Sequence, residues 1–429
     1  MRIPAFFTGS CLSVCLALVM ASSGVGQGVL LPASGAVNRG MAGATTGAAV
    51  ESIGSMAWNP ATISGLGNEV GIGFEGLYSG YEIESTIPFF GSGSTSAENG
   101  VSPVPTAAWV HQLNNPNVTL GIGLFGVAGY SSNIPADPSN PVLGSPLGVG
   151  RVQGEAVFYQ IPMVLSIKVT DHLAIAAGPT LAMGRLSLNR NFFAAPNADL
   201  SYPAGNGTRY SFGGGAQLGL FYTPSCRWSF GANIKSPTWM ETFRYHSEDE
   251  NGNPRTDKVN FDLPMMVTFG TGFRPNNNLL LTSDLRFTDY HNTEGFGDDA
   301  QFQADGAVSG LGWRSVFSAH LGARAKLTEK FYGMAGYVYC DKLIPDESSF
   351  FNLGSDLGYR HGFSMGGTWM CNSCLGLTAA YNYFPEWGAT GPVVTPIQAG
   401  PFPPGPIDGS SVAQRVSAQS LTLGVNVAY

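Results

Sequence analysis

A two-residue period of apolar side chains runs through most of this chain and is plainest at its C-terminus. The apolar members there are Leu421, Leu423, Val425, Val427 and Tyr429, and small or polar residues separate them. Successive side chains of a β-strand point to opposite faces, so this period predicts strands with one apolar face and one small or polar face. Such strands suit a transmembrane barrel, in which one face contacts lipid and the other faces the lumen.

About fourteen segments carry this pattern. We expect the strands near 69–83, 104–113, 118–130, 151–169, 172–190, 208–223, 226–246, 257–274, 278–290, 311–327, 330–343, 359–371, 374–384 and 414–429. The connections between them alternate between short turns, such as 170–171, and long loops, such as 191–207. Outer-membrane barrels have an even number of strands, short periplasmic turns and long external loops. The sequence therefore predicts an all-β fold, a transmembrane antiparallel β-barrel of about 14 strands over 69–429.

The composition agrees with a membrane barrel. Charged residues make up 12% of the chain, about half of the usual share of about 25%. Glycine contributes 58 of 429 residues, and the net charge is −8 without a basic block. A protein that binds a nucleic-acid backbone needs clustered Lys and Arg, so the sequence argues against a nucleic-acid partner.

The first residues have the order of a secretory signal peptide. Arg2 precedes the apolar run 11–20, and small residues follow it. We expect residues 1–26 to form the signal peptide, with cleavage after Ser23 or Gly26. Since no later segment reads as a transmembrane helix, the expected location is the outer membrane of a Gram-negative-type bacterium.

Residues 27–68 lack the strand pattern and are rich in Gly and Ala. Small residues allow close packing, so this segment could fill the lumen as a plug, or hatch. The alternative is a flexible periplasmic tail. Apolar residues such as Met56, Trp58 and Ile63 favour the plug.

At this segment the chain resembles the FadL/TodX family of outer-membrane transporters of long-chain fatty acids and aromatic hydrocarbons. The shared elements are Ser34-Gly35-Ala36, Arg39-Gly40, Ala42-Gly43, Trp58-Asn59-Pro60-Ala61, a first strand at Val70, Pro105–Trp109, Leu263-Pro264 and the C-terminal Gly424-x-Asn426-x-Ala428-Tyr429. They follow the family's order over essentially the whole mature chain. The last residue is Tyr429, where the family usually has Phe for recognition by the barrel-assembly machinery.

The resemblance implies a monomer that captures hydrophobic molecules on external loops and passes them to an internal apolar pocket. The plug then shifts, and the molecule leaves sideways through the wall beside a kinked strand. Gly126 and Gly129 are the candidates for that kink, because glycine tolerates the required backbone. The candidate plug and gating residues are Arg39, Gly40, Asn59, Pro60 and Ala61.

Apolar side chains in the predicted loops and near strand ends indicate where a ligand would bind. The ligand-binding candidates are Phe89, Phe90, Phe192, Phe193, Trp239, Met240, Phe243 and Arg244, and Phe350-Phe351 shows the same pattern. The alternative is an aromatic girdle at the membrane interface. Arg190, Arg209 and Arg244 could pair with a carboxylate or equally with lipopolysaccharide, so outer-membrane lipid is a second expected partner.

The remaining motifs point to no chemistry. Gly362-x-Ser364-x-Gly366 lies inside a predicted strand rather than a strand-to-helix turn, and we find no lumen-facing Ser/His pair, so an enzyme is not expected. The six histidines lack metal-ligand spacing, and no cofactor or metal is expected. Cys371 and Cys374 flank a predicted periplasmic turn and could form a local disulfide, with free thiols as the alternative.

Transport of hydrophobic small molecules across the outer membrane is the function that these observations favour together. The alternative is a passive porin for small polar solutes, which would have an unplugged, charged lumen.

Overall fold

Fourteen strands form a closed antiparallel barrel in this computed structural model, which describes residues 28–144, 148–198, 201–205, 207–355, 358–396 and 402–429. The predicted signal peptide therefore lies outside the described residues. The barrel strands are β1 (Glu69–Ile87), β3 (Val101–Gln112), β4 (Val118–Ile134), β5 (Val152–Thr170), β6 (Leu173–Asn189), β7 (Arg209–Tyr222), β8 (Trp228–Lys235), β12 (Met265–Asn276), β13 (Leu279–Asp289), β14 (Val316–Lys326), β15 (Phe331–Cys340), β16 (His361–Met370), β17 (Leu375–Trp387) and β21 (Ser411–Ala428).

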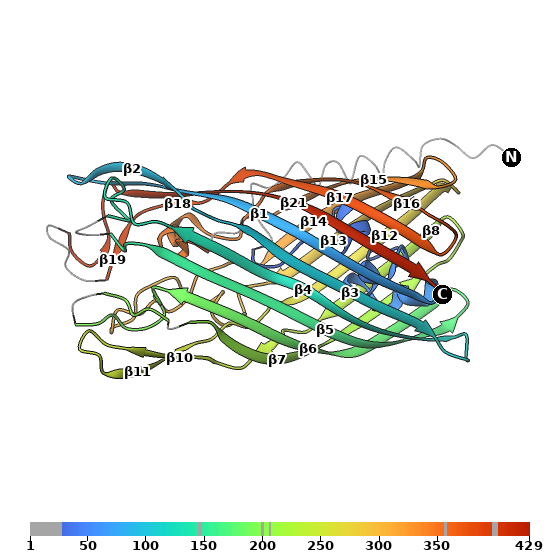
Figure 1. Cartoon of the computed structure of the whole chain (residues 1–429), viewed down its shortest axis with the longest axis horizontal. Helices are drawn as coiled ribbons and strands as arrows, with labels where there is room; N and C mark the ends of the chain where they lie inside the picture. The colour runs from blue at the N-terminus through green and yellow to red at the C-terminus, as the bar shows by residue number, and fades with distance from the viewer. Residues whose placement is uncertain (1–27, 145–147, 199–200, 206, 356–357, 397–401) are drawn as a thin grey trace.

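Each barrel strand pairs with the next one along the wall, and β21 closes the ring on β1. The closing ladder runs from Glu69–Ala428 to Thr86–Ser411. Short turns gather at the right-hand end in Figure 1, and long connections gather at the left-hand end. Because external loops are the long ones, the right-hand end is periplasmic and the left-hand end extracellular. The predicted fold class is confirmed.

The two faces of the strands divide as the two-residue period predicts. On β21, Leu421 and Leu423 are 54% and 53% exposed, whereas Thr422 between them is 1% exposed. On β1, Ile72 and Phe74 show the same outward position. The outer surface is therefore apolar and meets lipid, while small and polar side chains face the lumen.

Three predicted strands are shorter than expected, and one of them, predicted at 311–327, begins only at Val316. Of the strand predicted at 226–246, only β8 (Trp228–Lys235) belongs to the barrel wall. The strand predicted at 257–274 begins only at Met265. Pro237 and Pro264 stand at these two breaks, and proline has no N–H for a strand ladder. Beyond the breaks the chain forms β9 (Trp239–Met240) on β7, and β10 (Phe243–Glu248) pairs with β11 (Pro254–Val259) as a separate hairpin.

The other small elements belong to the extracellular loops. They are β2 (Gly91–Ser96), β18 (Thr390–Gly391), β19 (Val394–Thr395), β20 (Gly405–Pro406) and the 3-10 helix η2 (Asp346–Asn352).

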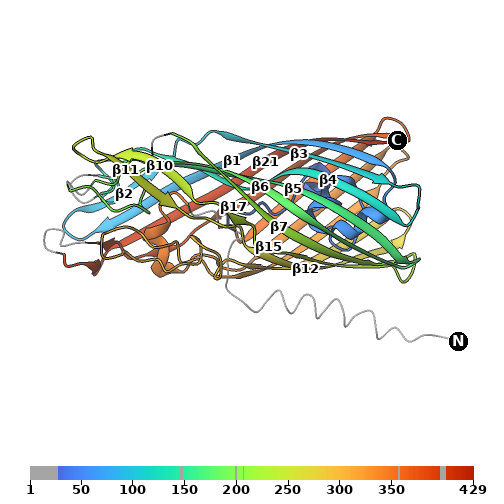
Figure 2. The same cartoon turned by 90° about the horizontal axis from the view of Figure 1, so that it is seen from below.

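The N-terminal segment lies inside the periplasmic half of the barrel. It forms α2 (Ala36–Gly40), α3 (Ser52–Trp58) and the 3-10 helix η1 (Pro60–Gly65), drawn in blue within the right-hand half of Figures 1 and 2. All residues of α2 and α3 are buried. Within the described part of the chain, no helix has the length and apolarity that crossing a membrane requires.

Candidate functional site

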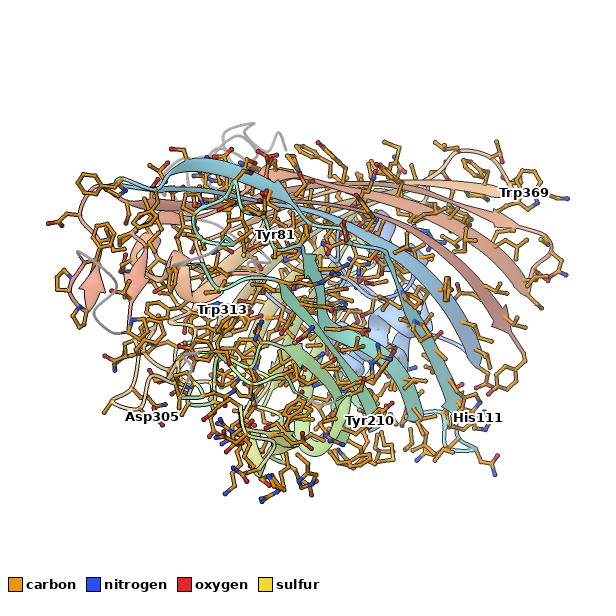
Figure 3. All side chains as sticks on the ribbon, turned by 60° about the vertical axis from the view of Figure 1, so that its left-hand side comes forward. Tyr81, His111, Tyr210, Asp305, Trp313 and Trp369 are labelled. Atoms are coloured by element: carbon orange, nitrogen blue, oxygen red, sulfur yellow. The ribbon has the colours of Figure 1, made fainter. Side chains whose placement is uncertain are left out.

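The extracellular half of the lumen contains a cavity of about 600 Å³. This volume falls within the range of about 300–1,000 Å³ that small-molecule sites occupy. Figure 3 places Trp313, one of its lining residues, within the extracellular half, whereas His111 and Trp369 lie toward the opposite end. The cavity is therefore set between the external loops and the N-terminal segment.

Strands β4, β5 and β6 supply one wall of the cavity. Every second residue of a strand points inward, and these inward residues place mostly apolar side chains on the cavity. They are Tyr130, Ser132, Ala156, Phe158, Leu186 and Leu188.

Aromatic rings from the loops supply much of the remaining lining. These rings are Phe192, Phe193, Phe261, Phe296, Phe302, Trp313, Phe350 and Phe351. The centroids of Phe296 and Trp313 are 4.7 Å apart, and Phe193 meets Phe261 edge-on at 5.2 Å. Tilted and edge-on pairs at such distances are favourable, so the rings support one another as a continuous apolar surface.

Polar groups at this cavity are few and are held in place. The indole N–H of Trp313 donates to Asn352 Oδ1 at 2.6 Å. Arg190 is the single charged side chain among the described lining residues, and its Nη1 donates to the carbonyl of Tyr202 at 3.2 Å. The site can therefore enclose an apolar molecule and offers it one cation.

Arg286 and Arg39 hold the N-terminal segment in the lumen through buried charges. Arg286 Nη1 donates to the carbonyl of Pro32 at 2.7 Å, and its guanidinium lies 3.5 Å from the ring centroid of Trp58. Arg39 pairs with Glu75 of β1 at 2.7 Å, and the two side chains are 1% and 3% exposed. These bonds join the segment to opposite parts of the wall, β13 and β1.

Asn59 connects the segment to a third part of the wall. Its Nδ2 donates to the carbonyls of Thr46 at 2.8 Å and Leu220 at 2.9 Å, while Oδ1 accepts from the N–H of Ala61 at 3.1 Å. A Cβ at Gly219 of β7 would lie 2.4 Å from Asn59 Oδ1, so only glycine leaves room for this contact. Pro60 opens η1, where its missing N–H costs nothing.

Glu51 caps the N-terminus of α3. Its carboxylate accepts from the N–H groups of Ile53 at 2.7 Å and Gly54 at 2.6 Å. Burial raises the pKa of Glu51 to about 7, and the neighbouring Glu69 carboxylate raises it further against the lowering effect of the two N–H bonds. The cap therefore carries a proton over a wider pH range than an exposed glutamate does.

The wall is interrupted between β3 and β4. Their ladder runs from Gln112–Thr119 and ends at Thr106–Phe125, although both strands continue toward the extracellular side. The β4–β5 ladder shifts register between Gly126 and Ala128.

A second cavity of about 110 Å³ lies at this interruption, and Gly126, Gly129 and Val104 line it. Tyr130 and Ala156 line both cavities, so the two cavities share part of their wall.

Residues 29–31 of the N-terminal segment pair with β4 at the same place. The N–H of Leu31 donates to the carbonyl of Val127 at 2.9 Å, and the N–H of Gly129 donates to the carbonyl of Val29 at 3.1 Å. Backbone groups that β3 leaves unpaired on β4 are thereby satisfied from inside the lumen.

Comparison with known proteins gives the same assignment for nearly the whole chain. The profile of the family described as "Outer membrane protein transport protein (OMPP1/FadL/TodX)" matches residues 17–429. The chain belongs to this family. Comparison with curated protein sequences gave no significant match.

Solved structures share the fold at low sequence identity. A Pseudomonas aeruginosa FadL homologue aligns with a TM-score of 0.69 at 15% identity, covering 94% of this chain and 99% of that one. The P. putida toluene transporter TodX gives 0.68 at 15% identity, with 93% and 99% covered. The Ralstonia pickettii toluene transporter TbuX gives 0.62 at 15% identity, with 91% and 98% covered. As a member of the FadL/TodX family, the chain is an outer-membrane transport protein.

The structure separates the predicted ligand-binding residues into three groups. Phe192 and Phe193 line the large cavity, as does the Phe350-Phe351 pair. Phe243 is buried behind it, edge-on to Phe158 at 6.4 Å, and Met240 packs against the same core. The residues that are exposed and do not line the cavity are Phe89 (93% exposed), Phe90 (42%), Trp239 (60%) and Arg244.

Several lining residues escaped the sequence analysis. Phe158 lies on the lumen face of a predicted strand, among small residues. The alternation of the strand's two faces could therefore have identified it as a lining residue. Phe296 and Trp313 stand singly in the long 290–315 connection, so no pair of adjacent rings marked them.

The plug candidates lie in the N-terminal segment inside the barrel and the kink candidates lie on β4, and their gating roles stay predictions. Gly40 packs against Met334 of β15, since an added Cβ would come 3.2 Å from its side chain. Gly126 and Gly129 lie at the wall interruption.

The disulfide predicted at the β16–β17 turn is not formed in this structure. Cys371 and Cys374 are exposed and their thiols are free. The side chain of Asn372 shapes the turn instead, because its Oδ1 accepts from the N–H groups of Cys374 and Leu375, both at 2.8 Å. Bridging in the oxidising periplasm stays a prediction.

A lumen-facing Ser/His pair does exist, contrary to the sequence analysis. Ser318 Oγ lies 3.0 Å from His320 Nε2 on β14, and His320 Nδ1 lies 2.6 Å from the carbonyl of Ala42. Both residues are at most 2% exposed and line none of the described cavities. The pair therefore fastens the N-terminal segment to the wall. Within the described residues, no cluster of three or more His, Cys, Asp or Glu could hold a metal ion.

Proposed function

We propose that this protein moves hydrophobic small molecules, such as long-chain fatty acids or aromatic hydrocarbons, inward across the outer membrane. The molecule enters from the external loops, occupies the large cavity and leaves sideways between β3 and β4. The observation that carries this proposal is the cavity of about 600 Å³ lined by aromatic rings. A site of this composition gains free energy by removing apolar surface from water.

The proposed exit follows from the wall interruption. The second cavity lies between the large cavity and the lipid-facing gap. An apolar molecule that reaches it can enter the membrane without crossing the polar, filled periplasmic half of the lumen. Gly126 and Gly129 would keep the opening wide, because they add no side chain to it.

The N-terminal segment is placed to control that exit. Trp313 of the large cavity contacts Tyr290 with ring centroids 5.1 Å apart, and the Tyr290 hydroxyl accepts from the N–H of Leu30 at 3.3 Å. Leu30 in turn bridges to Ala128 at the gap. Displacement of Trp313 by a ligand would therefore loosen residues 29–31 and open the path.

A bulky residue at the exit tests the route. Val104 of β3 lines the second cavity, whereas Val101 of the same strand is 66% exposed. We expect Val104→Trp to lower uptake of labelled oleic acid and toluene at least fivefold in cells that lack their own transporter, while Val101→Trp leaves it unchanged. Equal uptake by both variants and the parent protein would refute exit at this gap.

The alternative function, a passive porin, is tested by uptake measurements in the same cells. A polar pore predicts that a small sugar enters faster when the protein is present and that hydrophobic probes do not. We favour the hydrophobic route because residues 28–65 fill the lumen below the cavity. Function as a monomer, contact with lipopolysaccharide and recognition by the barrel-assembly machinery stay predictions.

A further inference from the structure

Lys235, the last residue of β8, faces the lumen beside the N-terminal segment. Phe230 and Ile234 of this strand are exposed on the lipid side, whereas Asn233 is buried. Because side chains alternate along a strand, Lys235 lies on the inward face with Asn233. Its Nζ is 5.2 Å from the ring centroid of Trp58. The wall therefore places an ammonium group against a ring of the segment.

This ammonium group has no carboxylate partner. Within the part of the chain that the structure describes, no Asp or Glu forms an ion pair with Lys235. The second cation on the Trp58 ring, the guanidinium of Arg286, is paired with Asp284. A charge that is removed from water costs much free energy unless it is paired. Lys235 therefore lacks the compensation that Arg286 has on the same ring.

A third cavity, of about 30 Å³, lies between the segment and the wall at this point, and we call it the Lys235 cavity. Leu31, Ser34 and Trp58 of the segment line it, and so do Gln160 and Lys235 of the wall. None of its described lining residues is acidic. Since about 10–15 Å³ suffices for one water molecule, this volume accepts one small ion.

An unbonded amide lies next to the Lys235 side chain. Gln217 of β7 is the direct ladder partner of Lys235, so the two side chains share the inward face. Gln217 is 4% exposed, and neither its Nε2 nor its Oε1 has a hydrogen-bond partner among the described residues. Buried amides are ordinarily bonded. The NH₂ group of Gln217 is therefore available to an acceptor bound at Lys235.

We propose that the Lys235 cavity binds one small monovalent anion, held by the Lys235 ammonium and the Gln217 amide between the N-terminal segment and the wall. One cation matches one negative charge, and the volume suits a halide ion or a carboxylate group. A carboxylate at the end of a longer molecule has a route from the exit cavity, because Leu30 and Leu31 line both cavities. Since groups from both sides surround the anion, its binding stabilises the docked segment.

Hydrogen exchange of the purified full chain in chloride and in gluconate tests this tie. Gluconate has the same charge, but its polyhydroxyl chain suits neither the small cavity nor the apolar exit cavity. We expect exchange in residues 52–58, which include Trp58, to be at least threefold slower in chloride at equal ionic strength. Lys235→Met should remove the difference, whereas Lys258→Met, at an exposed position, should keep it. Lys235→Gln is measured in parallel, so that a folding failure of one variant leaves the test intact.

Crystals grown with bromide locate the ion directly. An anomalous peak beside Lys235 Nζ is expected in the parent protein. Laurate and 1-dodecanol have the same chain and differ in the charge of the head, so they distinguish the two sources of the anion. Loss of the peak with laurate but not with dodecanol assigns the site to the carboxylate of an amphiphile as well as to halide. A peak that survives laurate restricts the site to the free ion.

Three outcomes overturn the proposal. They are equal exchange in the two salts, a chloride effect that persists in the Lys235 variants, and the absence of a bromide peak beside Lys235. Neither measurement involves uptake. The anion site is therefore decided independently of the proposed transport function.

Discussion

The extracellular and periplasmic halves of the lumen are filled in opposite ways. The extracellular half leaves about 600 Å³ open among aromatic rings, whose hydrophobic attraction for an apolar molecule is non-directional. The periplasmic half is closed by residues 28–65, which are held by directed bonds from Arg39, Asn59 and Arg286. Rings can accommodate molecules of different shape, whereas directed bonds either form or break. The first half is therefore suited to binding and the second to switching.

Removing the N-terminal segment should leave both halves of the lumen open. Deleting residues 28–68 leaves the closed strand ladder and empties the periplasmic half. We expect a folded barrel that stays heat-resistant on a gel and shows a large rise in conductance in planar bilayers. Unchanged conductance would contradict a plug.

Arg286→Met should have the next largest effect. The substitution removes the bonds to Pro32 and Gly43 and leaves the Asp284 carboxylate buried without its cation. Breaking a buried pair in this way costs about 3–5 kcal/mol. Hydrogen exchange in residues 52–58 should accelerate strongly.

Arg185→Met is the matched control, because the Arg185–Glu155 pair is 38% and 42% exposed. Such exposed pairs contribute about 0–1 kcal/mol. Similar exchange in the two variants would show that the buried pair does not hold the segment.

Asn59→Ala should loosen the segment less. It leaves the carbonyls of Thr46 and Leu220 without their donor, at a cost of about 1–3 kcal/mol. Uptake of a labelled fatty acid should change while the barrel remains heat-resistant. Asn292→Ala, at an exposed loop position, is the control. If Asn59→Ala changes neither uptake nor exchange, this bend does not gate transport.

Phe193→Ala should act on the extracellular half alone. Phe193 lines the cavity and meets Phe261, so its loss weakens binding of an apolar ligand by about 1–2 kcal/mol. Titration of the purified protein with oleic acid measures the effect, and exchange in residues 52–58 should not change. Trp239→Ala removes an outward ring and should leave affinity intact. Equal affinity losses in the two variants would contradict a cavity-specific effect.

A pH effect should follow the titration of one group, Glu51, whose carboxylate caps α3. With its pKa raised from 4.5 to about 7, Glu51 holds its proton more tightly when the segment is docked. Rising pH therefore disfavours docking between about pH 4.5 and 7, and the effect is constant outside that window.

Exchange in residues 52–58 should be slower at about pH 5 than at about pH 7.5 after correction for the intrinsic rate. Glu51→Gln should remove the difference. A difference that persists in Glu51→Gln would assign the pH effect to another group.

The barrel itself followed from local features of the sequence. A two-residue period and the parity of the connections are properties of neighbouring residues, and they predicted all fourteen strands. Boundary errors occurred where Pro237 and Pro264 broke a ladder within apolar stretches, and at 311–327, where the strand begins only at Val316. The outward face of each strand also followed, because lipid contact makes the same demand on every strand.

The cavity was decided by the tertiary structure. Phe193, Phe261, Phe296 and Trp313 come from three different connections, and their contacts depend on how the loops return over the lumen. The same holds for Arg286 and Pro32, which meet across 254 residues of sequence. The two-residue period and the composition predict on which face of a strand a side chain lies. Which distant groups share the enclosed space is fixed only when the barrel closes, because closure brings the facing walls together around the segment within.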